Sequence, residues 1–210
     1  MKTLIVSYLP SLEDSSTKKI LDAFTSSIKN STIEYLDLLK NPPSFFMADS
    51  LAAYRMRNYG GVKLNKEQET SIASIDSMCQ QLKSADIVVL AYPMHNFGMP
   101  GIIKTYFDAV LQHGETFKYG AKGPEGLMKG KKALTIYTSG GGYSADKATH
   151  EYPNWDTLTV LSKIEFSFMG YSEIEIIGAQ GTLNASPGYK EKAIADASEK
   201  VKKIAEKWNL

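Results

Sequence analysis

Three short stretches hold the residues best suited to chemistry, because each concentrates hydroxyls, amides or glycines. They are the hydroxyl triplet Ser15, Ser16 and Thr17, the loop Pro93, Met94, His95, Asn96 and Phe97, and the turn Ser139, Gly140, Gly141 and Gly142. Hydroxyls beside free backbone N–H groups suit a phosphate. Amides beside apolar side chains suit a planar, partly polar ring.

The hydroxyl triplet stands where a helix is expected to begin. The first N–H groups of a helix have no partner inside it, so together with the three hydroxyls they can hold a phosphate. Helix capping is the alternative, although capping needs only one hydroxyl. No G-x-x-x-x-G-K-[ST] and no G-x-G-x-x-G follows the first expected strand, which argues against an NTPase and a dinucleotide-binding fingerprint.

The other two stretches favour the edge of a flat ligand. Pro93 and Pro100 stiffen the first loop, and Gly98 is expected to adopt a backbone angle that other residues resist. The four residues from 94 to 97 then offer an apolar surface with amide donors. Three consecutive glycines at 140–142 let the backbone approach a ring closely and turn its N–H groups toward it, the alternative being a flexible surface loop.

The elements that must position these stretches follow from the alternation of apolar runs with longer amphipathic segments. Helix starts are expected near Asn65 and Ser186 as caps. Strands are expected at 3–8, 33–38, 85–92, 132–139 and 173–180, and helices at 15–29, 65–83, 100–113, 154–169 and 187–208. Strict alternation predicts an α/β fold, a doubly wound five-stranded parallel sheet with helices on both faces. Such sheets bind ligands at the carboxyl ends of their strands, where all three stretches lie.

Composition limits the classes of function. With 210 residues and 43% apolar content, we expect one domain over 1–210. A net charge of +1 with scattered basic residues argues against nucleic-acid binding. No apolar run approaches the ~20 residues that span a bilayer, so no membrane association and a cytoplasmic location are expected. The single cysteine, Cys79, excludes an internal disulfide and a Cys-rich metal site, and its apolar neighbours predict a buried side chain.

The segment 41–61, "NPPSFFMADSLAAYRMRNYGG", is expected to leave the sheet and to contain a short helix. With Phe117 and Tyr119 it would expose large rings to water, so we expect a homodimer in which a partner covers them and completes a shared site. The alternative is that the rings at 45, 46 and 54 fold back on their own chain. His113 and His150 lack metal-site spacing and are interpreted as structural or surface residues.

Several motifs resemble the FMN-dependent NADH azoreductase and quinone reductase family of flavodoxin-like proteins. They are "YPMHNF", "GETFKYGAKGPEGL", "GKK" and "SGGG", in family order, and the likeness extends over nearly the whole chain. The resemblance implies a single flavodoxin-like FMN-binding domain. It also implies that the hydroxyl triplet holds the FMN phosphate, that the loop 93–97 lies along the isoalloxazine ring, and that the turn 139–142 borders the ring's other edge.

The resemblance further implies an enzyme that takes electrons from NADH or NADPH and reduces quinones or azo compounds with ping-pong kinetics. The flavin carries the chemistry, so no catalytic side chain is required. His95 could donate a proton, polarise a flavin carbonyl or replace an aromatic wall. A non-catalytic flavodoxin-type electron carrier is the alternative, but such carriers tend to be strongly negative. A phosphodiesterase is disfavoured, because no paired His and Asp motif of a two-metal hydrolase is present.

The chain departs from the family pattern at four positions. Leu9 stands where a serine is common, with Ser11 as a possible substitute, and His95 replaces an aromatic residue. Gly140 stands where arginine is frequent, and the "AQG" at 179–181 replaces A-E-G. These differences bear on substrate preference and nucleotide handling more than on flavin binding.

Overall fold

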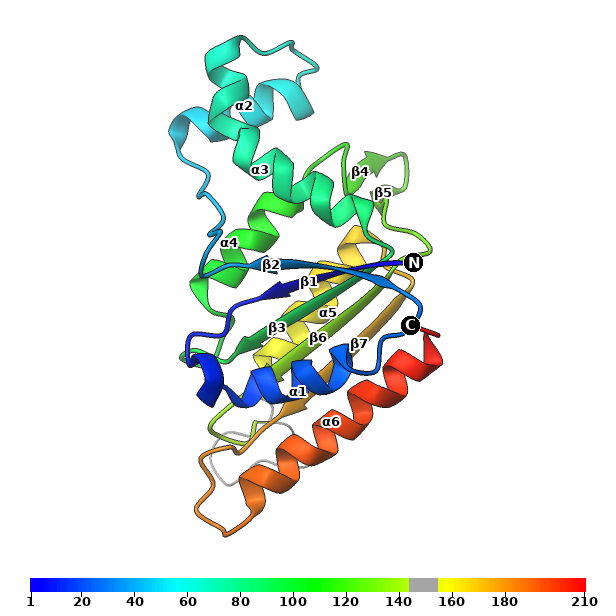
Figure 1. The fold of residues 1–210 in the computed structure, drawn as a ribbon. Helices are drawn as coiled ribbons and strands as arrows, with labels where there is room; N and C mark the ends of the chain where they lie inside the picture. Colours follow the sequence, from blue (N-terminus) through cyan, green and yellow to red (C-terminus); the bar gives the residue numbers. More distant parts are fainter. Residues whose placement is uncertain (144–154) are drawn as a thin grey trace.

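A five-stranded parallel sheet with helices on both faces forms the centre of the protein, in a computed structural model that describes residues 1–143 and 155–210 (Figure 1). The strands are β1 (Lys2–Ser7), β2 (Thr32–Asp37), β3 (Ile87–Pro93), β6 (Lys132–Thr138) and β7 (Glu173–Ala179). Their spatial order is β2-β1-β3-β6-β7, with every neighbouring pair parallel. The doubly wound five-stranded sheet predicted from the sequence is therefore confirmed.

In the described part of the chain, five helices cover the sheet, and each corresponds to a helix expected from the sequence. On one face lie α1 (Ser16–Thr25) and α6 (Tyr189–Lys207), and on the other lie α3 (Lys66–Ser84), α4 (Gly101–Val110) and α5 (Thr157–Met169). A single 3-10 turn, η1 (Leu12–Asp14), precedes α1. Because both faces are buried, central strands such as β3 are continuous apolar runs without alternation.

The two predicted helix caps have different outcomes. Asn65 caps α3 as expected: its side chain accepts from the Gln68 N–H at 2.9 Å, and the Gln68 side chain accepts from the Asn65 N–H at 3.0 Å. The cap predicted at Ser186 is wrong. Gly188 occupies the cap position of α6 with φ 75°, a left-handed conformation suited to glycine, so the helix begins at Tyr189.

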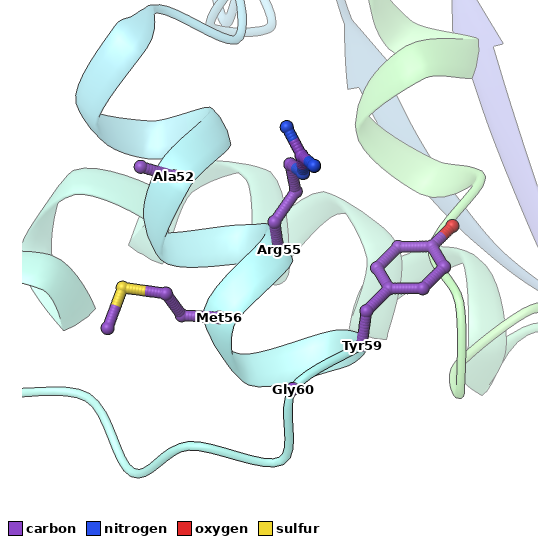
Figure 2. A pocket seen from close by; sticks show the side chains of 5 residues that line it. All are labelled: Ala52, Arg55, Met56, Tyr59 and Gly60. Carbon is purple, nitrogen blue, oxygen red and sulfur yellow. The ribbon is translucent and has the colours of Figure 1, made fainter.

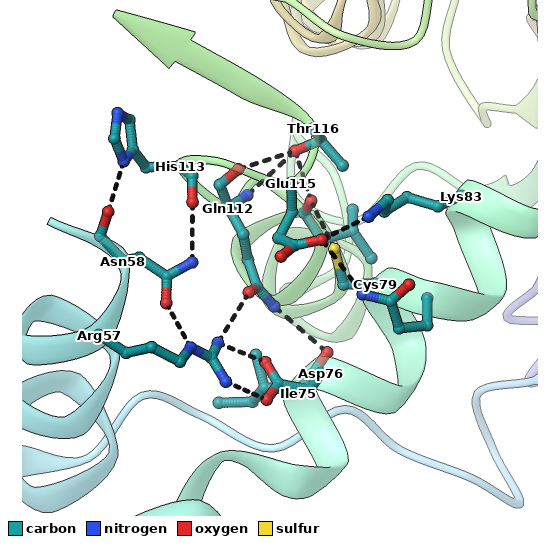
Figure 3. Close-up of polar contacts among 12 residues, drawn as sticks. Arg57, Asn58, Ile75, Asp76, Cys79, Lys83, Gln112, His113, Glu115 and Thr116 are labelled. Atoms are coloured by element: carbon teal, nitrogen blue, oxygen red, sulfur yellow. Dashed lines mark hydrogen bonds and ion pairs between the residues drawn. The ribbon is translucent and has the colours of Figure 1, made fainter. Parts of the chain in front are cut away.

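The excursion expected at 41–61 contains a helix, α2 (Ala48–Asn58), which packs on α3 away from the sheet (Figure 1). Figure 3 shows the polar contacts that fix it there. Arg57 forms two hydrogen bonds with the Asp76 carboxylate, at 2.5 and 2.8 Å, which raise the pKa of the guanidinium. The His113 ring donates from Nδ1 to the Asn58 carbonyl at 2.7 Å, and the Asn58 amide donates to the His113 carbonyl at 2.8 Å. His113 is therefore structural, as predicted.

An antiparallel hairpin of β4 (Phe117–Gly120) and β5 (Gly123–Gly126) was not expected from the sequence. Its strands are only four residues long and contain glycine and charged residues, so they lack apolar alternation. The hairpin docks closely on the end of α5. A Cβ on Gly126 would lie 2.3 Å from the backbone N of Gly170, so only glycine fits there.

The aromatic side chains of the excursion and the hairpin divide into two groups. Phe117 is 6% exposed and Tyr54 9% exposed, so the expectation of an exposed ring is wrong for Phe117, which its own chain covers. Phe46 packs against Tyr54 with ring centroids 5.2 Å apart. Phe45 and Tyr119 remain 69% and 60% exposed. Folding back on the same chain therefore accounts for some of these rings and leaves others open.

Candidate functional site

The three predicted stretches meet at the carboxyl edge of the sheet, because they follow the adjacent strands β1, β3 and β6 (Figure 1). Hydrogen bonds join them directly. The Tyr8 N–H donates to the Ala91 carbonyl at 2.9 Å, and the Met94 N–H donates to the Thr138 carbonyl at 2.7 Å. The hydroxyls of Thr17 and Thr138 lie 2.7 Å apart and tie the start of α1 to the end of β6. The predicted meeting of these loops is thus observed.

At the start of α1, the members of the hydroxyl triplet have different surroundings. The Ser15 hydroxyl caps the helix by accepting from the Lys18 N–H at 3.1 Å. The Thr17 hydroxyl is buried and bonded to Thr138, whereas Ser16 is partly exposed. Within the described part of the chain, the N–H groups of Ser16 and Thr17 have no hydrogen-bond partner. Main-chain donors at a positive helix end therefore remain available for an anion.

After β3, the chain makes a tight two-residue turn at Asn96 and Phe97. The His95 N–H donates to the Gly98 carbonyl at 3.0 Å, and the Gly98 N–H donates to the His95 carbonyl at 2.9 Å. Asn96 has φ 44° and Phe97 has φ 65°, so the central pair of the turn takes the left-handed conformation. The expectation that Gly98 supplies the unusual angle is wrong, because Gly98 follows the two central residues.

Phe97 is a backbone outlier, since bulky side chains rarely adopt a positive φ. Neighbours hold it in place: the Thr157 hydroxyl bonds its carbonyl, and its ring meets Tyr143 and Trp155 edge-on at 5.8 and 5.4 Å. Strain of this kind is concentrated at binding sites. Phe97 is 49% exposed, so a face of this fixed turn is open to a ligand.

His95 is exposed, and its ring meets Tyr8 edge-on at a centroid distance of 5.5 Å. Tyr8 was not singled out from the sequence, although it directly follows β1 at the ligand-binding edge. The two rings form a wall between the loops that follow β1 and β3.

The turn after β6 is fixed by its neighbours. The carbonyls of Ser139, Gly140 and Gly141 accept from the N–H groups of Thr182, Leu183 and Gly181, each at 3.0 Å. The Ser139 hydroxyl also donates to the Gly141 carbonyl at 2.8 Å. Among the described residues, the N–H groups of 140–142 have no hydrogen-bond partner, so they are available to a ligand. A free surface loop does not have this pattern.

A pocket of about 720 Å³ lies elsewhere, on α2, and none of the predicted site residues lines it. Figure 2 shows its lining: Ala52, Arg55, Met56, Tyr59 and Gly60. In residues 1–143 and 155–210, no group of three His, Cys, Asp or Glu side chains is placed to hold a metal ion. The same residues include no helix with the length and apolarity needed to cross a membrane. His150 lies outside the described residues.

Comparisons with known proteins agree with one another. Residues 1–205 match a family described as having a flavodoxin-like fold. The chain is 31% identical to the FMN-dependent NADH:quinone oxidoreductase 1 of Bacillus anthracis, over 99% of this chain and 96% of that protein. It is 38% identical to the FMN-dependent NADH:quinone oxidoreductase of Paraburkholderia phymatum, in an alignment that spans 64% of each protein.

A solved structure, the FMN-dependent NADH-azoreductase from Bacillus anthracis in complex with FMN, superimposes with a TM-score of 0.81. Its sequence is 30% identical, and the superposition covers 97% of this chain and 99% of that one.

Proposed function

This chain belongs to the flavodoxin-like family of FMN-dependent NADH:quinone oxidoreductases, and we propose that it is itself such an enzyme, reducing quinones and azo compounds. One observation carries the proposal. At one edge of the sheet lie a fixed turn with its carbonyls occupied and, at the start of α1, N–H groups that have no partner among residues 1–143 and 155–210. The N–H groups of α1 suit a phosphate dianion, and the turn suits the polar edge of a ring.

The described residues offer groups suited to the phosphate and to the ring of FMN. The N–H groups of Ser16 and Thr17 match the phosphate, with Ser15 holding the helix end in shape. The turn at 94–97 offers apolar side chains and an amide to one edge of the ring. The turn at 139–142 offers backbone N–H groups to the opposite edge. We propose that these loops bind the cofactor in that order.

When bound, FMN would supply the hydride-transfer chemistry that links NADH or NADPH to the second substrate in two separate half-reactions. The chain's own residues then bind the cofactor and orient its ring. The start of α1 holds the phosphate, and the strained turn at Asn96 and Phe97 fixes where the ring can lie. His95 and Tyr8 wall the site, and we propose this packing role for His95. An electron carrier without catalysis is the alternative, but the net charge of +1 gives no strong field to steer a redox partner.

Anaerobic addition of NADH to the FMN-loaded protein tests the proposal. We expect the flavin absorbance to bleach with one equivalent of NADH, and a quinone or azo dye to restore it. Initial rates should give parallel double-reciprocal lines, as ping-pong order requires. A flavin that NADH leaves oxidised would favour the electron carrier, and intersecting lines would contradict the ping-pong order. Repeating the titration with NADPH measures the preference between the two donors.

We also propose that a second copy of the chain covers the exposed apolar side chains and completes the substrate site. Phe45 and Met47 are each 69% exposed, Tyr119 is 60% exposed, and on α5 Val160 and Ile164 are 57% and 56% exposed. These large side chains on one small domain favour burial by a partner. A cytoplasmic location is part of the same proposal, because that compartment supplies NADH.

Sedimentation of a charged variant tests the dimer. Phe45→Glu should dissociate it and lower quinone reduction, because a carboxylate cannot be buried unpaired at an interface. Tyr35→Glu is the matched control, since Tyr35 is 62% exposed on the edge strand β2. A monomer with full activity at micromolar concentration would contradict the shared site.

A further inference from the structure

Behind the turn at 139–142 lies a buried polar network that centres on Gln180, at the end of β7. The Gln180 side chain is 2% exposed. Its Nε2 donates to the Tyr137 hydroxyl at 2.6 Å and to Asp156 Oδ2 at 2.9 Å. Its Oε1 accepts from the N–H of Tyr143 at 2.7 Å. One amide thus joins Tyr143, directly after the glycine turn, to the buried Tyr137 hydroxyl and to the half-buried Asp156 carboxylate.

The direction of these bonds follows from the donors and acceptors present. The Asp156 carboxylate can only accept, and it accepts from the Tyr137 hydroxyl at 2.8 Å and from the Thr159 hydroxyl at 2.9 Å. Burial raises the pKa of the Tyr137 hydroxyl, so it keeps its proton. The amide nitrogen of Gln180 must therefore face the carboxylate, which leaves its oxygen for the Tyr143 N–H. Rotating the amide would set its oxygen against the carboxylate and its nitrogen against the Tyr143 N–H.

We propose that Gln180 is a positioning residue for the flavin: through the Tyr143 N–H it holds the turn at 139–142 in the shape that the ring requires. The choice of FMN as the ligand rests on the proposed function, whereas the hydrogen bond from Tyr143 to Gln180 shapes the turn with or without a ligand. Without Gln180 the carbonyl contacts to 181–183 remain, but the backbone at Tyr143 loses its hydrogen bond to the Gln180 amide. The turn then samples other shapes, and FMN binding must select one of them.

The chemistry of the network also predicts what a glutamate at position 180 would do in this chain. A glutamate there would place a second carboxylate beside Asp156, and two adjacent carboxylates share a proton with a raised pKa. Below that pKa the pair keeps one hydrogen-bonded proton and the network is intact. Above it both groups are charged and repel each other. A glutamate variant should therefore hold the turn at low pH and release it as the pH rises.

Three variants of the network test the inference, through the FMN dissociation constant of the apoprotein from pH 5.5 to 8.5 and the amide exchange rate at Tyr143. Gln180→Leu removes the acceptor, and we expect about tenfold weaker FMN binding and faster exchange at every pH. The FMN affinity of Gln180→Glu should equal that of the unmodified protein at pH 5.5 and should fall toward that of Gln180→Leu at pH 8.5. The double variant Gln180→Glu with Asp156→Asn should regain FMN affinity at pH 8.5, because asparagine can donate to the new carboxylate and can also cap α5.

Gln81→Glu is the matched control. Gln81 donates to the Glu34 carboxylate on the far side of the molecule, so the same change beside the same kind of group should leave FMN binding at every pH unaffected. If Gln180→Leu does not fold, Tyr137→Phe replaces it. That variant removes one acceptor of the Gln180 amide and should speed Tyr143 exchange less strongly.

Two results would overturn the inference: FMN affinity and Tyr143 exchange unchanged in Gln180→Leu, or a pH profile of Gln180→Glu that parallels the unmodified protein. Failure of the proposed function looks different. In that case the unmodified apoprotein does not bind FMN, while the exchange rate at Tyr143 still responds to Gln180.

Discussion

Replacing Ser16 with proline deletes one backbone donor at the start of α1 and leaves the helix in place. Ser16 is the first helical residue, where proline is favoured because its missing N–H has no partner inside the helix. Ser15 already has the extended conformation that a following proline requires, with φ −67° and ψ 118°. The bond from the Lys18 N–H to the Ser15 hydroxyl is untouched. The fold should therefore keep its stability.

The deleted N–H group is one that we expect to donate to the FMN phosphate. A hydrogen bond to a charged group contributes about 1.5–3 kcal/mol, so Ser16→Pro should weaken FMN binding by roughly 10- to 150-fold. Fluorescence quenching of FMN by the apoprotein measures this directly. Riboflavin has the same ring without the phosphate, and its weaker affinity should not change.

Ser16→Ala is the control, because alanine removes the hydroxyl and keeps the N–H. We expect its FMN affinity to lie within a few fold of the unmodified protein. Equal affinities for Ser16→Pro and Ser16→Ala would refute the assignment of the phosphate to the backbone donors of α1. A parallel loss of riboflavin affinity in Ser16→Pro would refute it as well, since the substitution would then have disturbed the ring.

Three further predictions concern the framework of the site. Thr17→Val should lower the free energy of unfolding in urea by about 1–3 kcal/mol, because it leaves the buried hydroxyl of Thr138 without its hydrogen-bond partner. Adding Thr138→Val should recover part of this lost stability. No recovery would count against this tie between α1 and β6. Gly126→Ala should cost about 1–3 kcal/mol or more by overpacking against the backbone at the end of α5, whereas Gly101→Ala, with open space around it, should be neutral. Burial raises the pKa of the Cys79 thiol to about 12, so it stays protonated at pH 8 and should resist iodoacetamide until the protein is unfolded; rapid alkylation of the native protein would contradict this.

Much of the fold could be predicted because its signals are local. Strands such as β3 are unbroken apolar runs, and the Asn65 cap lies three residues before its Gln68 partner, so both can be recognised in a short window. The hairpin at 117–126 could not be recognised this way. Its position depends on the contact of Gly126 with the backbone at Gly170, which is distant in sequence.

The site likewise combines features that could be predicted from the sequence with features that depend on distant residues. The three loops could be placed together because parallel strands bring their carboxyl ends to one edge. The details depend on tertiary partners: Thr17 uses its hydroxyl on Thr138, and the left-handed angles fall on Asn96 and Phe97 instead of Gly98. The role of Gln180 is equally hidden, because its partners come from β6, α5 and the glycine turn.

A crystal structure of the protein with FMN tests the central claim most directly. We predict the phosphate within hydrogen-bond distance of the backbone nitrogens of Ser16 and Thr17, and the ring between the turn at 94–97 and the turn at 139–142. FMN bound anywhere else, such as the pocket on α2, or bound at this edge with its phosphate away from α1, would contradict the account.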